Sequence, residues 1–297
     1  MAASITEQRN PASSNLDRLP TAELVALINR EDQSVPLAVE AALPQVTAAV
    51  DAIIERFQKG GRLFYVGSGT SGRLGVLDAV ECPPTFGVAP DRVQGVLASG
   101  DGAIFRAVEG AEDDREAGAG DLSERECRPV DVVMGISASG RTPYVLGALD
   151  YAQSVGALTL SLTSNPGSAL TSAAEIPIVA TTGPEVVTGS TRMKAGTAQK
   201  LILNMISTAV MVRMGYVLGN LMVKVQLKNE KLIERGRRIV SEVTDCSPEN
   251  AAQALDVAEN DVRLAILVAK HKLDISAAQQ HLAAAGDNLW RALESTP

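Results

Sequence analysis

Five short apolar runs, separated by segments with helical spacing, constrain the fold of this chain more than any other feature. The runs lie at residues 63–66, 93–97, 130–136, 158–162 and 176–179. Several are rich in β-branched side chains, as strands buried on both faces of a parallel sheet are. Helical patterns at residues 71–80, 103–111 and 142–155 lie between them. This alternation predicts an α/β fold with a doubly wound, mostly parallel sheet.

Helical segments flank this pattern on both sides in the sequence. The N-terminal segment is polar and interrupted by proline, which indicates an arm that packs on another part of the protein. Apolar residues then recur at helical spacing from Val35 to Lys59, and Pro44 is expected to kink or restart this helix because proline has no N–H to donate. Residues 190–217 predict a long, mostly apolar helix, and the pattern beyond Gly219 is helical and more charged. We predict an N-terminal arm and helix over residues 1–51, the α/β domain over 52–217, and a small C-terminal helical region over 218–297.

The overall charge and the low aromatic content argue against several kinds of partner. A net charge of −8 disfavours non-specific attraction to nucleic acid. Aromatic residues make up only 3% of the chain, too few for a stacking platform that binds bases or a long neutral glycan. No apolar run is long enough to span a bilayer, and the N-terminus lacks the apolar core of a signal peptide. The sequence therefore predicts no nucleic-acid and no membrane partner, and favours a small ligand held by polar loops.

The cysteine and histidine residues give no indication of a metal site. Cys82, Cys127 and Cys246 are widely spaced and odd in number, which suits a reducing compartment and supports neither a disulfide framework nor a zinc site. His271 and His281 lack a neighbouring cluster of Cys or carboxylate ligands, and we interpret them as ordinary residues of a helix surface. We expect a cytoplasmic protein without a metal and without His-based catalysis.

A loop rich in glycine and hydroxyl groups follows the first predicted strand. This first loop, residues 67–72, has the sequence GSGTSG. Ligands of open α/β sheets bind beyond the carboxyl ends of the strands, where glycine lets the backbone approach an anion and the next helix offers its N-terminus. The pattern also matches G-x-G-x-x-G of dinucleotide-binding proteins, but Asp91 precedes the next strand and Asp101 comes late for a ribose contact. The hydroxyls of the loop favour a phosphate monoester instead; they belong to Ser68, Thr70 and Ser71.

Two further loops repeat this chemistry. The second loop, residues 137–142, follows the third predicted strand and carries Ser137, Ser139 and Thr142. The third loop, residues 188–194, opens the long helix and carries Ser190 and Lys194. One Ser/Thr cluster at a helix start is usually only a cap, but three such loops in one fold are hard to explain as caps alone. We predict that they converge on a small phosphosugar.

Longer motifs around these loops resemble a known family. The segments GSGTSGRLGVLDAVECPPTFG, AVEGAEDDRE, ASGRTPYV and EVVTGSTRMKAGTAQKLILNM occur in this order, and together they are far more specific than one glycine loop. They resemble the N-acetylmuramic acid 6-phosphate etherases, which belong to the sugar isomerase (SIS) domain family. The resemblance runs from about Asn15 through Arg237. It implies that residues 52–217 are a SIS phosphosugar-binding domain and that the protein is a homodimer.

The reaction of that family sets requirements on the site. The etherases cleave the D-lactyl ether of N-acetylmuramic acid 6-phosphate to N-acetylglucosamine 6-phosphate and D-lactate, in the recycling of cell-wall amino sugars. The resemblance implies elimination of lactate followed by addition of water, with no cofactor. Such an elimination needs a general acid at the ether oxygen and a general base at C2, whose proton is acidic when C1 is an aldehyde.

The resemblance assigns two carboxylates to this chemistry. Glu81, in the motif ECPPT, is expected to be the proton donor, and desolvation by its apolar neighbours would raise its pKa. Glu112, in the motif GAED, is expected to act as acid or base, or as electrostatic support. From the residues alone, a solvated acidic helix end explains Glu112 as well, and nothing distinguishes it from Glu109.

Two other functions stay open on the same fold. An aldose–ketose isomerase of phosphosugars would share the loops and a carboxylate base, but it would need no acid at an ether oxygen. A non-catalytic phosphosugar-sensing regulator, such as the related glucokinase regulatory protein, would bind the ligand without turnover. The presence of both Glu81 and Glu112 in their motifs favours the lyase.

Overall fold

In the computed structural model, which describes residues 4–106, 108–227 and 229–295, five parallel strands form one sheet. The strands stand in the order β2-β1-β3-β4-β5. β1, β3 and β4 are buried along their whole length, as the continuous apolar runs predict. The doubly wound parallel sheet is therefore confirmed, and each of its strands coincides with a predicted run: β1 (Leu63–Gly67), β2 (Val93–Leu97), β3 (Val132–Ile136), β4 (Leu158–Thr163) and β5 (Ile176–Val179).

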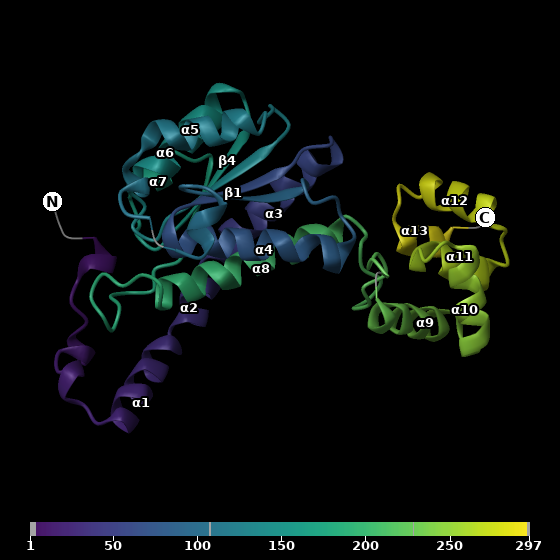
Figure 1. Ribbon diagram of the computed structural model, residues 1–297, viewed down its shortest axis with the longest axis horizontal. Helices are drawn as coiled ribbons and strands as arrows, with labels where there is room; N and C mark the ends of the chain where they lie inside the picture. The colour runs from purple at the N-terminus through teal and green to yellow at the C-terminus, as the bar shows by residue number, and fades with distance from the viewer. Residues whose placement is uncertain (1–3, 107, 228, 296–297) are drawn as a thin grey trace. The chain divides into compact units, whose positions relative to one another are not determined.

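Helices cover both faces of this sheet (Figure 1). α6 (Pro143–Ser154) and α7 (Ala169–Ser172) pack on one face, and α5 (Arg115–Glu124) lies against α6. α3 (Leu43–Gln58), α4 (Gly69–Phe86) and α8 (Lys194–Arg213) lie on the other face. The side chains of β1 alternate accordingly: Phe64 belongs to the apolar cluster under α6, whereas Tyr65 lies against Gly75 of α4.

The N-terminal part folds largely as its pattern predicts. An arm of 3₁₀ turns, residues 4–19, leads into α1 (Thr21–Asp32). The segment with helical spacing then forms two helices, α2 (Val35–Ala41) and α3, and α3 restarts next to Pro44. Among the described residues, no single helix has the length and apolar composition needed to cross a membrane, although the bent pair Thr21–Ala41 and Leu43–Gln58 meets those two criteria when taken together.

The helix predicted at residues 103–111 is wrong. In the described parts of this segment, residues 101–106 and 108–113, the chain forms two short 3₁₀ turns instead, η4 (Asp101–Ile104) and η5 (Ala111–Asp113). The carbonyl groups of Ala103 and Ile104, which would accept helix hydrogen bonds, instead accept bonds from the side chain of Arg73. The helical pattern at residues 71–80 was in turn too short, because α4 continues through Pro83 and Pro84 to Phe86. The N–H of Gly87 donates to the carbonyl of Pro83 at 2.9 Å and completes that last turn.

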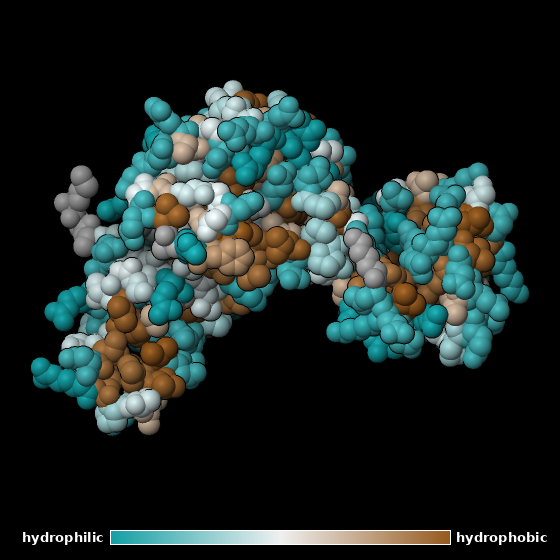
Figure 2. All heavy atoms as spheres, in the orientation of Figure 1, coloured by the Kyte–Doolittle hydropathy of each residue, from teal (hydrophilic) through white to brown (hydrophobic). Residues whose placement is uncertain are grey.

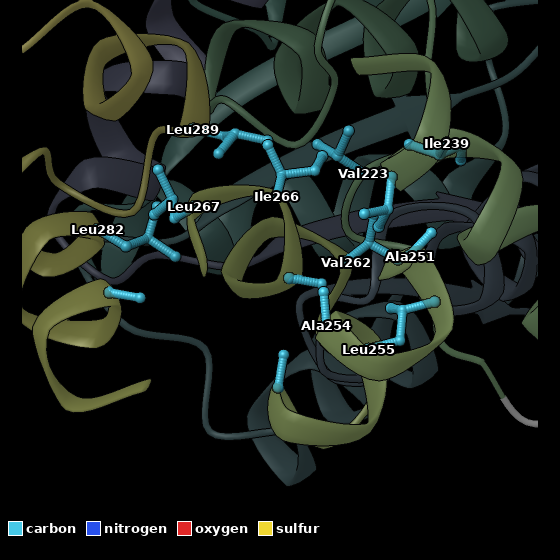
Figure 3. Packing of buried hydrophobic residues seen from close by; sticks show 14 of the residues in the cluster. Val223, Ile239, Ala251, Ala254, Leu255, Val262, Ile266, Leu267, Leu282 and Leu289 are labelled. Atoms are coloured by element: carbon cyan, nitrogen blue, oxygen red, sulfur yellow. The ribbon is translucent and has the colours of Figure 1, made fainter. Parts of the chain in front are cut away.

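The chain divides by its internal contacts into two units. Unit 1 comprises Met1–Val80 and Asp91–Ser207, and unit 2 comprises Glu81–Pro90 and Thr208–Pro297. Unit 2 has its own apolar core, in which side chains such as Val223, Ile266 and Leu289 pack together (Figure 3). Its helices are α9 (Glu230–Thr244), α10 (Pro248–Val257), α11 (Val262–His271), α12 (Ile275–Ala284) and α13 (Leu289–Glu294).

Polar caps explain where the helices of unit 2 begin. A side-chain oxygen of the residue before each helix accepts a hydrogen bond from a backbone N–H in the first turn, which satisfies one of the groups that a helix start leaves unpaired. Ser247 accepts from the N–H of Asn250 in α10, and Asp274 accepts from the N–H of Ala277 in α12. The complete set is Asn229, Ser247, Asp261, Asp274 and Asn288.

Close packing of α5 on α6 leads to a first prediction, about stability. A Cβ atom on Gly118 of α5 would lie 1.9 Å from the carbonyl oxygen of Tyr144 in α6, and backbone cannot yield as a flexible side chain can. We expect Gly118→Ala to lower the free energy of unfolding by about 1–3 kcal/mol. Gly120→Ala, on the same helix but with open space around it, is the matched control and should raise that free energy by about 0.5–1 kcal/mol. Urea unfolding followed by circular dichroism measures both, and equal effects of the two changes would contradict the packing argument.

Candidate active site

The first and second predicted loops lie where the winding of the sheet reverses. β2 lies on one side of β1. β3 lies on the other side and is followed outward by β4 and β5. Ligands of open α/β sheets bind at such a switch point, beyond the carboxyl ends of the strands. Gly67 and Ile136, the last residues of β1 and β3, are paired in register, so the first and second loops leave the sheet side by side.

Glycine allows the first loop to turn tightly into α4. A Cβ atom on Gly67 would lie 2.6 Å from the backbone nitrogen of Gly72, and one on Gly72 would lie 2.5 Å from the carbonyl oxygen of Gly67. α4 begins at Gly69, within the loop, so the first turn of the helix is formed by the loop itself. Free N–H groups at a helix start attract anions, which agrees with a phosphate site here.

A cavity of about 170 Å³ opens beside this helix start. Ser68 and Gly69 form one wall, and the segment after β2 forms the other. Both candidate carboxylates of that segment, Glu109 and Glu112, line the cavity together with Arg73. The remaining lining residues are mostly small or apolar: Ala98, Ala103, Val108, Gly110 and Ala111.

One hydrogen bond joins the first loop to a predicted carboxylate. The hydroxyl of Ser68 donates to Oε2 of Glu112 at 3.1 Å. Glu112 lies in the 3₁₀ turn η5, which Gly110 opens with a left-handed φ of 75°. Of the two carboxylates in the cavity wall, it is thus Glu112 that the structure links to the loop.

Arg73 is a cavity residue that the sequence reasoning missed. Its guanidinium donates to the carbonyl oxygens of Ala103, Ile104 and Arg106 at 3.0, 3.1 and 3.3 Å, and so holds the wall that carries the carboxylates. Arg73 is the fifth residue of α4, near the positive end of the helix dipole, and its hydrogen bonds to these carbonyl oxygens help to compensate its charge there. The signal in the sequence that could have identified Arg73 is its position directly after the GSGTSG loop.

The hydroxyls of the second loop are mainly bonded to one another. Ser137 Oγ lies 2.8 Å from Thr142 Oγ1 and 3.2 Å from Ser139 Oγ. Ser137 also accepts from the N–H of Gly140 at 3.1 Å and is buried, whereas Ser139 and Thr142 are half-buried. The loop is therefore preformed, and its two more accessible hydroxyls are the ones available to a ligand.

α8 contacts the first loop at two predicted binding residues of that loop, Thr70 and Ser71. The hydroxyl of Ser71 donates to Oε1 of Gln199 at 3.0 Å, and both residues are buried. The methyl group of Thr70 lies 3.3 Å from the position of a Cβ on Gly196. The first loop is thus supported by α8, and neither Thr70 nor Ser71 lines the cavity.

A buried carboxylate, Asp78, ties α4 to α8 about two turns beyond Ser71. Asp78 accepts hydrogen bonds from Asn204 at 2.6 Å and from Ser207 at 3.1 Å. Burial raises the pKa of Asp78 above its ordinary value, although these two hydrogen bonds oppose the change. Its contacts give Asp78 a structural role in holding α4 in place.

The structure places the cation of the third loop away from the cavity. Lys194 is buried, and its Nζ pairs with Oε2 of Glu31 at 2.7 Å. Both oxygens of Glu185, itself buried, accept from the backbone N–H groups of Lys194 and Ala195 at 3.0 and 2.9 Å, and so cap α8. Ser190 is half-buried in the turn before the helix.

Glu81 lies within α4 and is exposed. The residues before it on this helix, Leu77 and Val80, are apolar and are themselves 53% and 57% exposed. The single chain therefore does not supply the desolvation that the apolar neighbours led us to expect, because those neighbours also face outward. Among the residues that the structure describes, no three His, Cys, Asp or Glu side chains come together in a way that could hold a metal ion.

Two family models match the chain. Residues 45–153 match the glucokinase regulatory protein N-terminal SIS domain, and residues 117–209 match the SIS domain. The phosphoheptose isomerase GmhA from Neisseria gonorrhoeae has a similar structure, with a TM-score of 0.51 and 17% identity, over 64% of this chain and 98% of that one. At this identity the likeness shows the fold alone.

Curated relatives match nearly the whole chain. The N-acetylmuramic acid 6-phosphate etherase of Glaesserella parasuis serovar 5 (strain SH0165) is 56% identical over 278 residues, which cover 94% of this chain and 91% of that protein. The protein of the same name from Aeromonas hydrophila subsp. hydrophila is 58% identical over 268 residues, 90% of each chain. That from Pasteurella multocida (strain Pm70) is 52% identical over 291 residues, 98% of this chain and 97% of the relative.

Proposed function

The chain belongs to the N-acetylmuramic acid 6-phosphate etherase family, and from this premise we propose how its residues perform the reaction. The protein is a carbon–oxygen lyase that converts N-acetylmuramic acid 6-phosphate into N-acetylglucosamine 6-phosphate and D-lactate. It thereby serves the recycling of cell-wall amino sugars. The observation that supports our assignment of the site most directly is the hydrogen bond between Ser68 and Glu112, which puts a carboxylate at the first loop.

The open-chain form of the sugar makes the elimination possible. With C1 as an aldehyde, a base removes the C2 proton, and the electron pair forms a C2–C3 double bond as the C3–O bond breaks. The departing oxygen, which becomes the hydroxyl of D-lactate, takes a proton from a general acid. Water then adds at C3 while a proton returns to C2. Correctly placed acid–base groups contribute about 10²- to 10⁴-fold each to such steps.

We assign Glu112 as the base and Glu81 as the acid. Glu112 suits a base because it lines the cavity beside the helix start that would bind the phosphosugar. Glu81 stands in the motif ECPPT of α4. The 6-phosphate would bind to the loops of residues 52–217. We assign to it the more accessible hydroxyls, those of Ser68, Ser139, Thr142 and Ser190, while the hydroxyls of Thr70, Ser71 and Ser137 would hold these loops in place.

A homodimer would give Glu81 the apolar environment that it lacks in the single chain. Large apolar side chains are exposed on α1, α2 and α4 of unit 1, among them Val25, Leu37, Leu77 and Val80. Figure 2 shows apolar atoms gathered over α1. A second subunit that covered Leu77 and Val80 would take the neighbouring Glu81 out of water and raise its pKa, as a proton donor requires. Light scattering gives the mass in solution, and a monomer would argue against this arrangement.

We infer that the protein works in the cytoplasm. Its three cysteines, Cys82, Cys127 and Cys246, are widely spaced in the sequence and odd in number, which suits a reducing compartment. The expected substrate, a sugar phosphate, is also an intracellular class of metabolite. Fractionation of cells that produce the protein tests this placement, and recovery outside the cytoplasmic fraction would contradict it.

Incubation of the purified protein with N-acetylmuramic acid 6-phosphate tests the reaction. We expect free D-lactate and N-acetylglucosamine 6-phosphate in equal amounts, since elimination and hydration give one of each. An isomerase would convert an aldose phosphate into a ketose phosphate without lactate, and a sensor would bind the sugar without turnover. Either result would overturn the lyase assignment.

A further inference from the structure

The N-terminal arm, residues 4–19, is joined to two of the three loops through Asn165 and Glu31. In Figure 1 its first turns lie beside the chain that leads into α8. Thr6 of the arm is completely buried and Asn10 is 7% exposed, so the arm is packed against the rest of unit 1 along its first turns. Polar side chains make its contacts, and each contact ends next to a residue of a predicted binding loop.

Asn165 connects the arm to the second loop. Its Oδ1 accepts from the hydroxyl of Ser4 at 2.6 Å and from the N–H of Thr6 at 3.4 Å. Its Nδ2 donates to the hydroxyl of Thr6 at 3.0 Å and to the carbonyl oxygen of Ala138 at 2.8 Å. Ala138 stands between Ser137 and Ser139. Asn165, 5% exposed, therefore holds the arm and the backbone of the second loop at once.

Asn10 and Glu31 connect the arm to the third loop. Nδ2 of Asn10 donates to Oε2 of Glu31 at 2.7 Å and to the carbonyl oxygen of Pro184 at 3.3 Å. The same Oε2 of Glu31 binds Nζ of Lys194 at 2.7 Å. The hydrogen bond from Lys194 also holds the pKa of Glu31 below its ordinary value. The arm thus holds the carboxylate that neutralises the buried cation of the third loop.

A buried cation without its partner is strongly unfavourable, so this contact has consequences for the loop. The side chain of Lys194 is 5% exposed and that of Glu31 is 22% exposed. If Glu31 were removed, Lys194 would move toward water and pull with it the first turn of α8, which Glu185 caps. The next turn of α8 supports Ser71 through Gln199. Loss of the arm contacts would therefore also weaken the support of the first loop.

We propose that the arm and Glu31 form a clamp that positions the second and third loops for the phosphosugar, with Asn165 and Glu31 as positioning residues. Neither touches substrate; both act through the backbone of Ala138 and the side chain of Lys194. The proposal rests on the proposed function, since it takes the three loops as the phosphosugar site. It gives Lys194 a part in binding without a direct contact to the phosphate.

Glu31→Ala and Asn165→Ala test the clamp, with Glu23→Ala on the exposed side of the same α1 as the matched control. In the lactate assay we expect KM to rise about ten- to a hundredfold in both test variants. We expect kcat to fall far less, because lost positioning of a binding loop weakens ground state and transition state alike. Glu31→Gln keeps a hydrogen-bond acceptor, so its KM should lie between that of Glu31→Ala and that of the unaltered protein. Glu23→Ala should match the unaltered protein.

Two further measurements separate the clamp from a general loss of folding. Hydrogen–deuterium exchange should become faster at residues 137–142 and 182–194 in the test variants, while the strands of the sheet stay protected. If Glu31→Ala does not fold, Asn10→Ala removes hydrogen bonds to Glu31 and Pro184 but no charge, and it should still raise KM. An unchanged KM in Asn165→Ala and in the Glu31 or Asn10 variant would overturn the proposal.

Binding of the product distinguishes a failed clamp from a failed function. Calorimetry with N-acetylglucosamine 6-phosphate needs no turnover. If the unaltered protein releases no lactate, the proposed reaction fails, yet weaker product binding by the test variants would still support the clamp. If lactate is released and product binding is the same in all variants, the clamp alone is wrong.

Discussion

Glu81→Gln should reduce the release of lactate by roughly 10²- to 10⁴-fold, because glutamine cannot protonate the departing ether oxygen. Glu81 is exposed in the single chain, so the change should alter the free energy of unfolding by less than about 0.5 kcal/mol. Affinity for N-acetylglucosamine 6-phosphate should also stay close to that of the unaltered protein, since the phosphate loops are untouched. The measurements are kcat for lactate and product binding by calorimetry.

Exchange of the C2 hydrogen sharpens this test. If Glu81 acts only on the leaving oxygen, the base can still remove the C2 proton in Glu81→Gln. In deuterium oxide we then expect deuterium at C2 of unreacted substrate without release of lactate. Glu116→Gln, an exposed carboxylate of α5, is the control and should behave as the unaltered protein. Turnover by Glu81→Gln within about twofold of the unaltered protein would exclude a role as general acid.

The exposure of Glu81 depends on more than its neighbours in the sequence. Apolar neighbours in a sequence predict desolvation only if something covers them, and Leu77 and Val80 of α4 are exposed. Whether a side chain loses water depends on every surface that meets it, including that of another subunit. The motif ECPPT therefore points to Glu81 as the proposed acid, while an apolar environment around its carboxyl group requires a second surface that covers Leu77 and Val80.

Strand positions could be predicted because a buried parallel strand needs an unbroken apolar run. The wrong helix at residues 103–111 had a different cause. Its apolar spacing is short, and the carbonyls of that segment are taken by Arg73, which is far away in the sequence. A local pattern carries no information about such a competitor. The same holds for Lys194, whose charge suggested a phosphate ligand until Glu31 proved to be its partner.

The cavity could be predicted only in outline. Loops that follow neighbouring parallel strands must leave the same edge of the sheet, so the first and second loops could be placed together from sequence. Only the resemblance of the GAED motif favoured Glu112 over Glu109, because both follow β2 in an irregular segment. The structure adds one difference between them, the hydrogen bond from Ser68 to Glu112.

Glu112→Gln and Glu109→Gln form a matched pair for the base. Both side chains line the cavity, both are exposed, and each change removes one negative charge at nearly the same place. We expect Glu112→Gln to lower kcat by about 10²- to 10⁴-fold, and Glu109→Gln to change it far less. A purely electrostatic role of the acidic segment would instead give similar losses in both variants.

Deuterium exchange again decides the role. A base at C2 must be present before any bond to the lactyl group breaks, so Glu112→Gln should lose both lactate release and incorporation of deuterium at C2. Glu81→Gln should lose only the first. If Glu112→Gln still exchanged the C2 hydrogen at the rate of the unaltered protein, another group would be the base. Glu112 would then be left to orient Ser68 at the first loop, a role that a higher KM rather than a lower kcat would reveal.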